Sequence, residues 1–178
     1  MDEELRLATY EEAPKGAESS SFDGRQWFTY GVGAVVMSAN NMDVAVGNLY
    51  GSLLYSDVAS AVAYGQSFDV TRQACIAAIE ALPTHPVYEL ARDALARARD
   101  LYEDRNQIAH GLWDGSPGPV DEVRQVVRYQ RHGKIRETEW TQRGLMFLAG
   151  ALIDCANELN SLAADVRTLR VAGAQHGK

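Results

Sequence analysis

Cysteine is scarce in this chain: of its 178 residues only Cys75 and Cys155 are cysteines. Each lies in an apolar, helix-like run without a second Cys or a His at metal-ligand spacing. This pattern disfavours a disulfide scaffold and a cysteine metal site. We expect two buried free thiols in a protein of a reducing compartment.

Long hydrophobic runs and an excess of positive charge are also missing. The longest apolar run, residues 32–37, is much shorter than the roughly 20 residues that a membrane helix needs. The acidic N-terminus does not resemble the basic and then apolar start of a secretory signal. The formal net charge of −7 disfavours a protein that coats nucleic acid through bulk charge, although it leaves room for a small basic site. We therefore expect a cytoplasmic protein with no membrane partner.

The residues that are present predict a single all-α domain. Hydrophobic residues make up 46% of the chain and charged residues 23%, which is typical of a globular protein with a sizeable core. Apolar spacing predicts helical regions over residues 23–55, 56–82, 86–110 and 141–169. We expect one helical domain over residues 23–170, a disordered tail over 1–22 and a frayed tail over 171–178.

Individual residues set the expected helix boundaries. The second helical region is expected to break near residues 65–68, with Asp69 as the cap of its second half. Pro86 suits the first position of the third helix, and Gly111 is placed to end it. Gly47 and Gly51 lie four residues apart, so a neighbouring helix can approach closely there.

A change of composition near residue 123 predicts a small inserted β-hairpin over about 123–140. Residues 124–130 and 134–140 are rich in β-formers, and His132-Gly133 stands between them. Five basic residues and no acid occur between positions 124 and 136, with Tyr129 among them; the basic residues are Arg124, Arg128, Arg131, Lys134 and Arg136. Two interpretations stay open: an arm that tracks RNA phosphates with Tyr129 stacking on a base, or an edge hairpin whose charges prevent strand pairing.

The chemistry-bearing residues gather at the end of the third helix. On a helix, Tyr102, Asn106 and His110 form one stripe that Arg99 extends by a turn. Arg105 is five residues before His110, so the two directions differ by roughly 140° on an ideal helix. The two side chains can converge if the helix ends at His110, or if a second copy of the helix packs alongside.

These residue types suit metal-independent cleavage of a phosphodiester. Arg supplies a permanent planar cation for phosphate, and His can donate or accept a proton. Asn can hold the imidazole or a phosphate oxygen. Such a reaction needs one group that moves protons and one group that stabilises the charge on the phosphate. We see no motif for a cofactor or a metal ion.

Residues 105–111, Arg-Asn-Gln-Ile-Ala-His-Gly, resemble the Arg-x4–6-His motif of HEPN domains, with a polar residue after the Arg. The resemblance covers roughly residues 25–170 and implies a bundle of four to five helices that works as a homodimer. Many members are metal-independent endoribonucleases of toxin–antitoxin, abortive-infection and CRISPR-linked defence systems. The resemblance implies catalytic roles for Arg105 and His110, a cyclic-phosphate product, and Asn106 as the residue that positions the phosphate or the imidazole. It also implies an RNA substrate, with an antitoxin or other protein as a further partner.

Two other classes of function stay open. The chain can be a catalytically silent HEPN-like module that binds a nucleotide or a protein partner. It can also be a structural helical protein in which Arg105 and Asn106 serve the helix end or an interface. Arg99 and Tyr102, on the same stripe as the motif, are further candidates for contact with RNA.

Overall fold

The computed structural model describes residues 24–113, 124–129 and 135–176 of the chain. These residues form five helices and a three-stranded antiparallel sheet. The helices are α2 (Gly24–Leu54), α3 (Asp57–Ala63), α4 (Phe68–Glu80), α5 (Pro86–His110) and α6 (Gln142–His176); the strands are β1 (Leu112–Trp113), β2 (Arg124–Tyr129) and β3 (Ile135–Trp140). The predicted all-α class is confirmed for this part of the chain, while the tail expected over residues 1–22 lies outside it.

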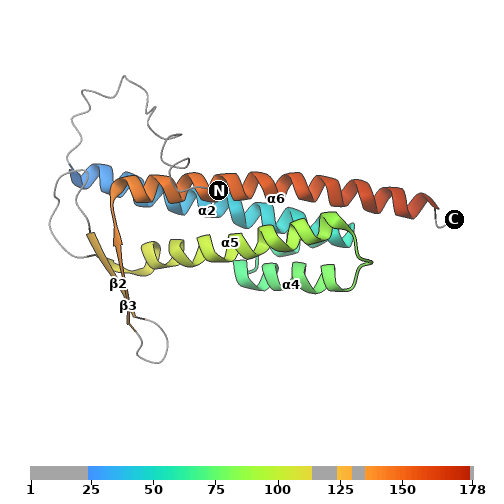
Figure 1. Cartoon of the computed structure of the whole chain (residues 1–178), viewed down its shortest axis with the longest axis horizontal. Coiled ribbons are helices and arrows are strands. Elements are labelled where there is room, and N and C mark those ends of the chain that lie inside the picture. The colour runs from blue at the N-terminus through green and yellow to red at the C-terminus, as the bar shows by residue number, and fades with distance from the viewer. Residues whose placement is uncertain (1–23, 114–123, 130–134, 177–178) are drawn as a thin grey trace, which may run out of the picture.

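Helices α2 and α6 lie side by side along the long axis of the molecule, and α5 packs against both (Figure 1). Gly31 of α2 faces Leu145 of α6, and Asn48 of α2 bonds Asn160 of α6 at 3.0 Å, so the two helices run in the same direction. Helix α5 runs the opposite way, and the sheet lies beyond its C-terminal end (Figure 1). The core between the long helices is apolar; its largest fully buried members include Met42, Leu49, Leu53, Leu95, Ile108, Leu145, Leu152 and Leu159.

A sharp corner joins α2 to α3, and the two expected glycines make it possible. Tyr55 has a φ of 51° and reverses the chain, while the Ser56 amide donates to the Gly51 carbonyl at 2.8 Å. The Ser56 hydroxyl then accepts from the Ala59 amide and caps α3. A Cβ on Gly51 would lie 1.8 Å from the Ser60 Oγ, and one on Gly47 would lie 3.1 Å from the Tyr64 ring. The close approach predicted at these glycines is therefore confirmed, and α3 is the helix that approaches.

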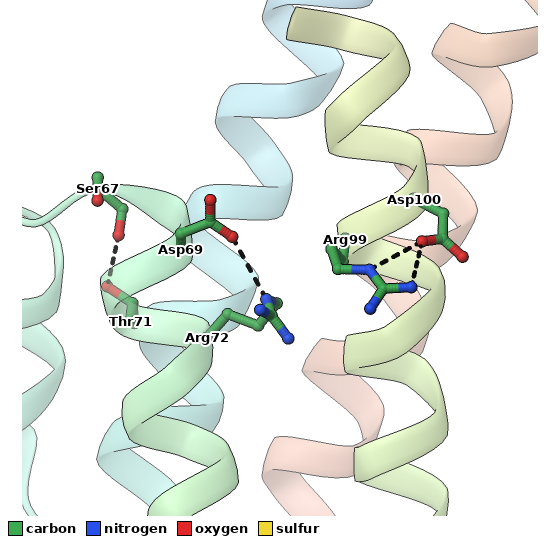
Figure 2. Close-up of polar contacts among 6 residues, drawn as sticks. All are labelled: Ser67, Asp69, Thr71, Arg72, Arg99 and Asp100. Atoms are coloured by element: carbon green, nitrogen blue, oxygen red, sulfur yellow. Dashed lines mark hydrogen bonds and ion pairs between the residues drawn. The ribbon is translucent and has the colours of Figure 1, made fainter. Parts of the chain in front are cut away.

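The start of α4 corrects one expectation. The cap is Ser67, whose backbone is extended, and Asp69 lies inside the first turn. Helix α4 begins earlier than the sequence suggested because Phe68 is a core residue, 5% exposed, that the helix must carry inward. Asp69 instead makes an ion pair with Arg72 at 3.5 Å (Figure 2). A carboxylate in this first turn also interacts favourably with the positive end of the helix dipole.

Helix α5 begins and ends where the sequence predicted. The His85 Nδ1 accepts from the Val87 amide, and Pro86 occupies the first position. The helix ends at His110 because Gly111 is extended, with φ −81° and ψ 156°, and leads into β1. Since that conformation is open to any residue, Gly111 ends the helix without the left-handed backbone that glycine often supplies.

Two features exceed the predictions. Helix α6 continues through Arg170 to His176, past the point where fraying was expected. The hairpin of β2 and β3 is confirmed, but β1 adds a third strand through the pairs Leu112–Val127 and Trp113–Val126. A two-residue strand is too short to produce an alternating sequence pattern. Its effect is to attach the sheet directly to the end of α5.

We expect Gly51→Ala to destabilise the fold by about 1–3 kcal/mol, because the new methyl group overlaps Ser60. Gly33→Ala is the matched control within α2: its Cβ would meet nothing within 4 Å, and removing a helical glycine should add about 0.5–1 kcal/mol. Urea unfolding of the two variants measures both values. Equal effects in the two variants would contradict the packing at the corner.

We expect both thiols to be unreactive in the native protein at neutral pH. Burial raises the pKa of Cys75 to about 12. Burial, followed by the charge of Glu158, raises the pKa of Cys155 to about 11. The reactive thiolate is thus nearly absent. Titration with an aromatic disulfide reagent should find two thiols per chain only after unfolding in guanidinium chloride; rapid reaction of the native protein would contradict this expectation.

Candidate functional site

Arg105 and His110 converge at the end of α5. The Nη1 atom of Arg105 lies 3.5 Å from the Nε2 atom of His110, although the two residues diverge by roughly 140° on an ideal helix. His110 is the last helical residue and is exposed, while Arg105 is half-buried one turn earlier. Of the two routes to convergence that the sequence left open, the helix end brings the pair together within one chain.

The core side of the same turn fixes this geometry. Gln107 and Ile108, which separate the two residues in sequence, are each about 1% exposed and point into the bundle. Because these two side chains occupy the inward face, Arg105 and His110 are left toward the outside. The amphipathic packing of the last turn of α5 thus places both side chains on its outer side.

The contact places a cation beside a ring that can transfer a proton. A guanidinium only donates hydrogen bonds, so His110 Nε2 can accept from Arg105 in the tautomer that carries its proton on Nδ1, whereas the other tautomer presents an N–H to the guanidinium. In either form an imidazole lies beside a guanidinium cation. A base next to a positive charge is the combination that phosphodiester chemistry uses.

Asn106 contacts Arg105, and its expected role in positioning the phosphate or the imidazole stays a prediction. Its Oδ1 atom accepts a hydrogen bond from Arg105 Nη1 at 2.9 Å. The same guanidinium nitrogen thus faces both Asn106 and His110. In this arrangement the amide oxygen of Asn106 orients Arg105. Asn106 is linked to the His110 imidazole only through the Arg105 guanidinium, which contacts both residues.

Tyr102 lies beneath Arg105 and ties the site to two other helices. The Cζ atom of Arg105 is 5.2 Å from the centroid of the Tyr102 ring, a cation–π distance. The ring stacks on Phe68 of α4, with centroids 4.0 Å apart and planes 5° apart. Its hydroxyl donates to Asp43 Oδ2 of α2 at 3.2 Å. The expected role of Tyr102 as an RNA contact stays a prediction, because these contacts already engage one face of the ring and the hydroxyl.

Asp43 and Phe68 are the residues that sequence reasoning missed. Both come from helices far from the motif in sequence, so no spacing rule links them to it. The available hint was the single acid at position 43 within an otherwise apolar and small stretch over residues 42–47. Burial raises the pKa of Asp43, while the Tyr102 hydrogen bond and the Arg105 charge oppose that rise.

The pKa of Tyr102 is raised to about 12, mainly by burial and then by the charge of Asp43. The phenol therefore stays protonated at neutral pH and keeps its role as a hydrogen-bond donor to the carboxylate.

Of the remaining predicted RNA contacts, Arg99 is the one whose side chain is described. Arg99 is exposed, and its guanidinium bonds Asp100 through two nitrogens at 2.9 and 2.7 Å (Figure 2). The strands that carry Arg124, Arg128, Tyr129 and Arg136 are described without their side chains, and Arg131 and Lys134 lie outside the described residues. The basic hairpin as an RNA arm stays a prediction; the described fact is that β2 pairs with the strand that follows His110.

Trp113 closes the end of α5. Its indole Nε1 donates to the Ile108 carbonyl at 3.2 Å, one of the last carbonyls of the helix that lack a partner within it. The Phe28 ring of α2 meets the indole edge-on, with centroids 4.5 Å apart. Trp113 is partly buried and packs against the core.

Comparison with known proteins adds no assignment: no family model, no curated protein and no solved structure matches the chain. The site is therefore described by its own geometry. Among the described residues, no cluster of three or more His, Cys, Asp or Glu side chains can hold a metal ion, and no helix is long and apolar enough to cross a membrane.

We expect Trp113→Phe to lower the free energy of unfolding by about 1 kcal/mol and to loosen the last turn of α5, because the Ile108 carbonyl loses its donor. Trp140→Phe is the matched control, since that indole bonds Thr138 within β3. Urea unfolding and amide hydrogen exchange of residues 108–112 measure the effects. Unchanged exchange in Trp113→Phe would show that the indole does not hold the helix end.

Proposed function

We propose that this protein is a metal-independent endoribonuclease of the HEPN type that acts as a homodimer. The observation that carries the proposal is the contact of Arg105 Nη1 with His110 Nε2 at an exposed helix end. A guanidinium beside an imidazole supplies one group that stabilises charge on the phosphate and one group that transfers a proton. The resemblance of residues 105–111 to the family motif supports the same assignment, and it suggests a toxin or effector of a prokaryotic defence system.

The proposed reaction is an internal transfer at phosphorus. The imidazole of His110 takes the proton from a ribose 2′-OH, and the oxygen attacks the neighbouring phosphorus. The bond from phosphorus to the 5′-oxygen breaks, which leaves a 2′,3′-cyclic phosphate on one fragment. The 5′-oxygen leaves with a proton and becomes a 5′-OH. Arg105 stabilises the charge that builds on the phosphate oxygens during the attack.

A second copy of the chain has a chemical use in this scheme. One imidazole can accept the proton of the nucleophile, but protonation of the leaving oxygen needs a second proton donor at the same moment. Two copies of the motif facing one cleft would supply both. The exposure of His110 leaves it open to such a partner.

The test is RNA cleavage by the purified wild-type protein in the presence of EDTA, compared with His110→Ala and Arg105→Ala. We expect each substitution to lower the rate by about 100-fold or more, because each removes one of the two catalytic groups. Arg92→Ala is the matched control: Arg92 lies near the start of the same helix and pairs with Glu89. It should cleave like the wild type.

The product ends and the binding properties separate the alternatives. A 2′,3′-cyclic phosphate, detected by its resistance to end-labelling until it is opened, supports the mechanism. Wild-type protein that binds nucleotides or RNA without cutting any of a varied set of RNAs would instead indicate the catalytically silent module. Equal cleavage by wild type and His110→Ala would point to a contaminating nuclease and would reject the proposal.

A further inference from the structure

A half-buried carboxylate on α2, that of Asp43, contacts the tyrosine ring on which the candidate catalytic arginine lies. We propose that Asp43 is a positioning residue of this site, which holds Arg105 in place through Tyr102 and through its own charge. The effect on RNA cleavage rests on the proposed function, but the effect on Arg105 does not. No part of the motif over residues 105–111 contains or predicts this residue.

The surroundings of Asp43 argue against a role in stability. Its neighbours Met42 and Ala45 are fully buried, and Asp43 itself is half-buried against α5. Its Oδ1 atom is buried and has no hydrogen bond among the described residues. A buried carboxylate with one unsatisfied oxygen costs folding free energy, and an apolar residue would cost less. Its position is therefore better explained by what it does to its neighbours.

A continuous series of contacts leads from Asp43 to the helix end. The carboxylate accepts from the Tyr102 hydroxyl at 3.2 Å, and the face of Tyr102 lies 5.2 Å from Arg105 Cζ. Phe68 stacks on the same ring and restrains its tilt. Arg105 in turn reaches His110 at 3.5 Å. A change at Asp43 is thereby transmitted to the contact that carries the chemistry.

Besides acting through Tyr102, the negative charge of Asp43 attracts the positive charge of Arg105 directly. Burial raises the pKa of Asp43, and the Tyr102 hydrogen bond and then the Arg105 charge act in the opposite direction. Arg105 Nε is also buried and has no hydrogen bond among the described residues, so the head group is fixed at Nη1 and from below by the ring. The negative charge on α2 supplies the attraction that keeps this long, flexible side chain against the helix. Such preorganisation is what a charge-stabilising group needs.

The substitution that separates charge from shape is Asp43→Asn. The amide oxygen of Asn can still accept from Tyr102, but the negative charge is gone. Tyr102→Phe is the complementary change, because it removes the hydroxyl and keeps the ring stacked on Phe68. Asp154→Asn, an exposed acid of α6 far from the site in the sequence, is the matched control for loss of one negative charge.

The first readout does not depend on activity. In the nitrogen-15 NMR spectrum of arginine side chains, the Arg105 Nε–H signal is assigned by its loss in Arg105→Lys. We expect this signal to shift and broaden in Asp43→Asn and in Tyr102→Phe, and to stay unchanged in Asp154→Asn. An unchanged Arg105 signal in Asp43→Asn would overturn the proposal, whether or not the protein cleaves RNA.

The second readout is RNA cleavage in EDTA. We expect Asp43→Asn to lower kcat by about 10- to 100-fold with little change in KM, because the guanidinium is misplaced while the RNA surface is kept. Wild-type activity in Asp43→Asn would overturn the proposal. If the wild type itself does not cleave, the proposed function fails and the NMR comparison alone decides the role of Asp43. If Asp43→Asn does not fold, the NMR signal of Arg105 and the RNA cleavage rate are measured in Tyr102→Phe, and these two results decide the proposal.

Discussion

The end of helix α5 at His110 is the constraint on which the candidate site depends. In an uninterrupted helix Arg105 and His110 would point roughly 140° apart and would share no ligand. The extended backbone of Gly111 stops the helix directly after His110, and β1 begins one residue later. The pairing of β1 with β2 and the bond from Trp113 to the Ile108 carbonyl hold that end in place. The small sheet thus holds in place the helix end that Gly111 defines.

Packing inside the bundle does the rest. Gln107 and Ile108 occupy the inward face of the last turn, so the functional side chains are left outside by exclusion. Contacts from α2 and α4, through Asp43 and Phe68, converge on Tyr102 beneath the guanidinium. Three helices thus contribute to the placement of one arginine. A site at a helix end would otherwise be as mobile as helix ends usually are.

Charge is distributed unevenly around this site. The chain carries a formal charge of −7, and acids and arginines are interspersed along α5. Arg92 and Arg99 are each paired with an acid on their own helix, and Arg97 is paired with Glu158 of α6. The guanidinium of Arg105 differs, because its described partners are an amide, a ring and an imidazole, with its acid held one residue away behind Tyr102. Its described contacts therefore include no direct ion pair with a carboxylate.

The sequence by itself determined the helical class, the bounds of α5, the hairpin and the identity of the Arg–Asn–His segment, because periodicity, Pro86 and Gly111 are local features. It placed the α4 cap wrongly at Asp69, since the burial of Phe68 decides that start. The tertiary structure alone decided that Arg105 meets His110 within one chain and that Asp43 lies behind Tyr102. Those contacts join residues on different helices or depend on where one helix stops. A helical wheel cannot predict these contacts, because it represents one uninterrupted helix without its end and without the neighbouring helices.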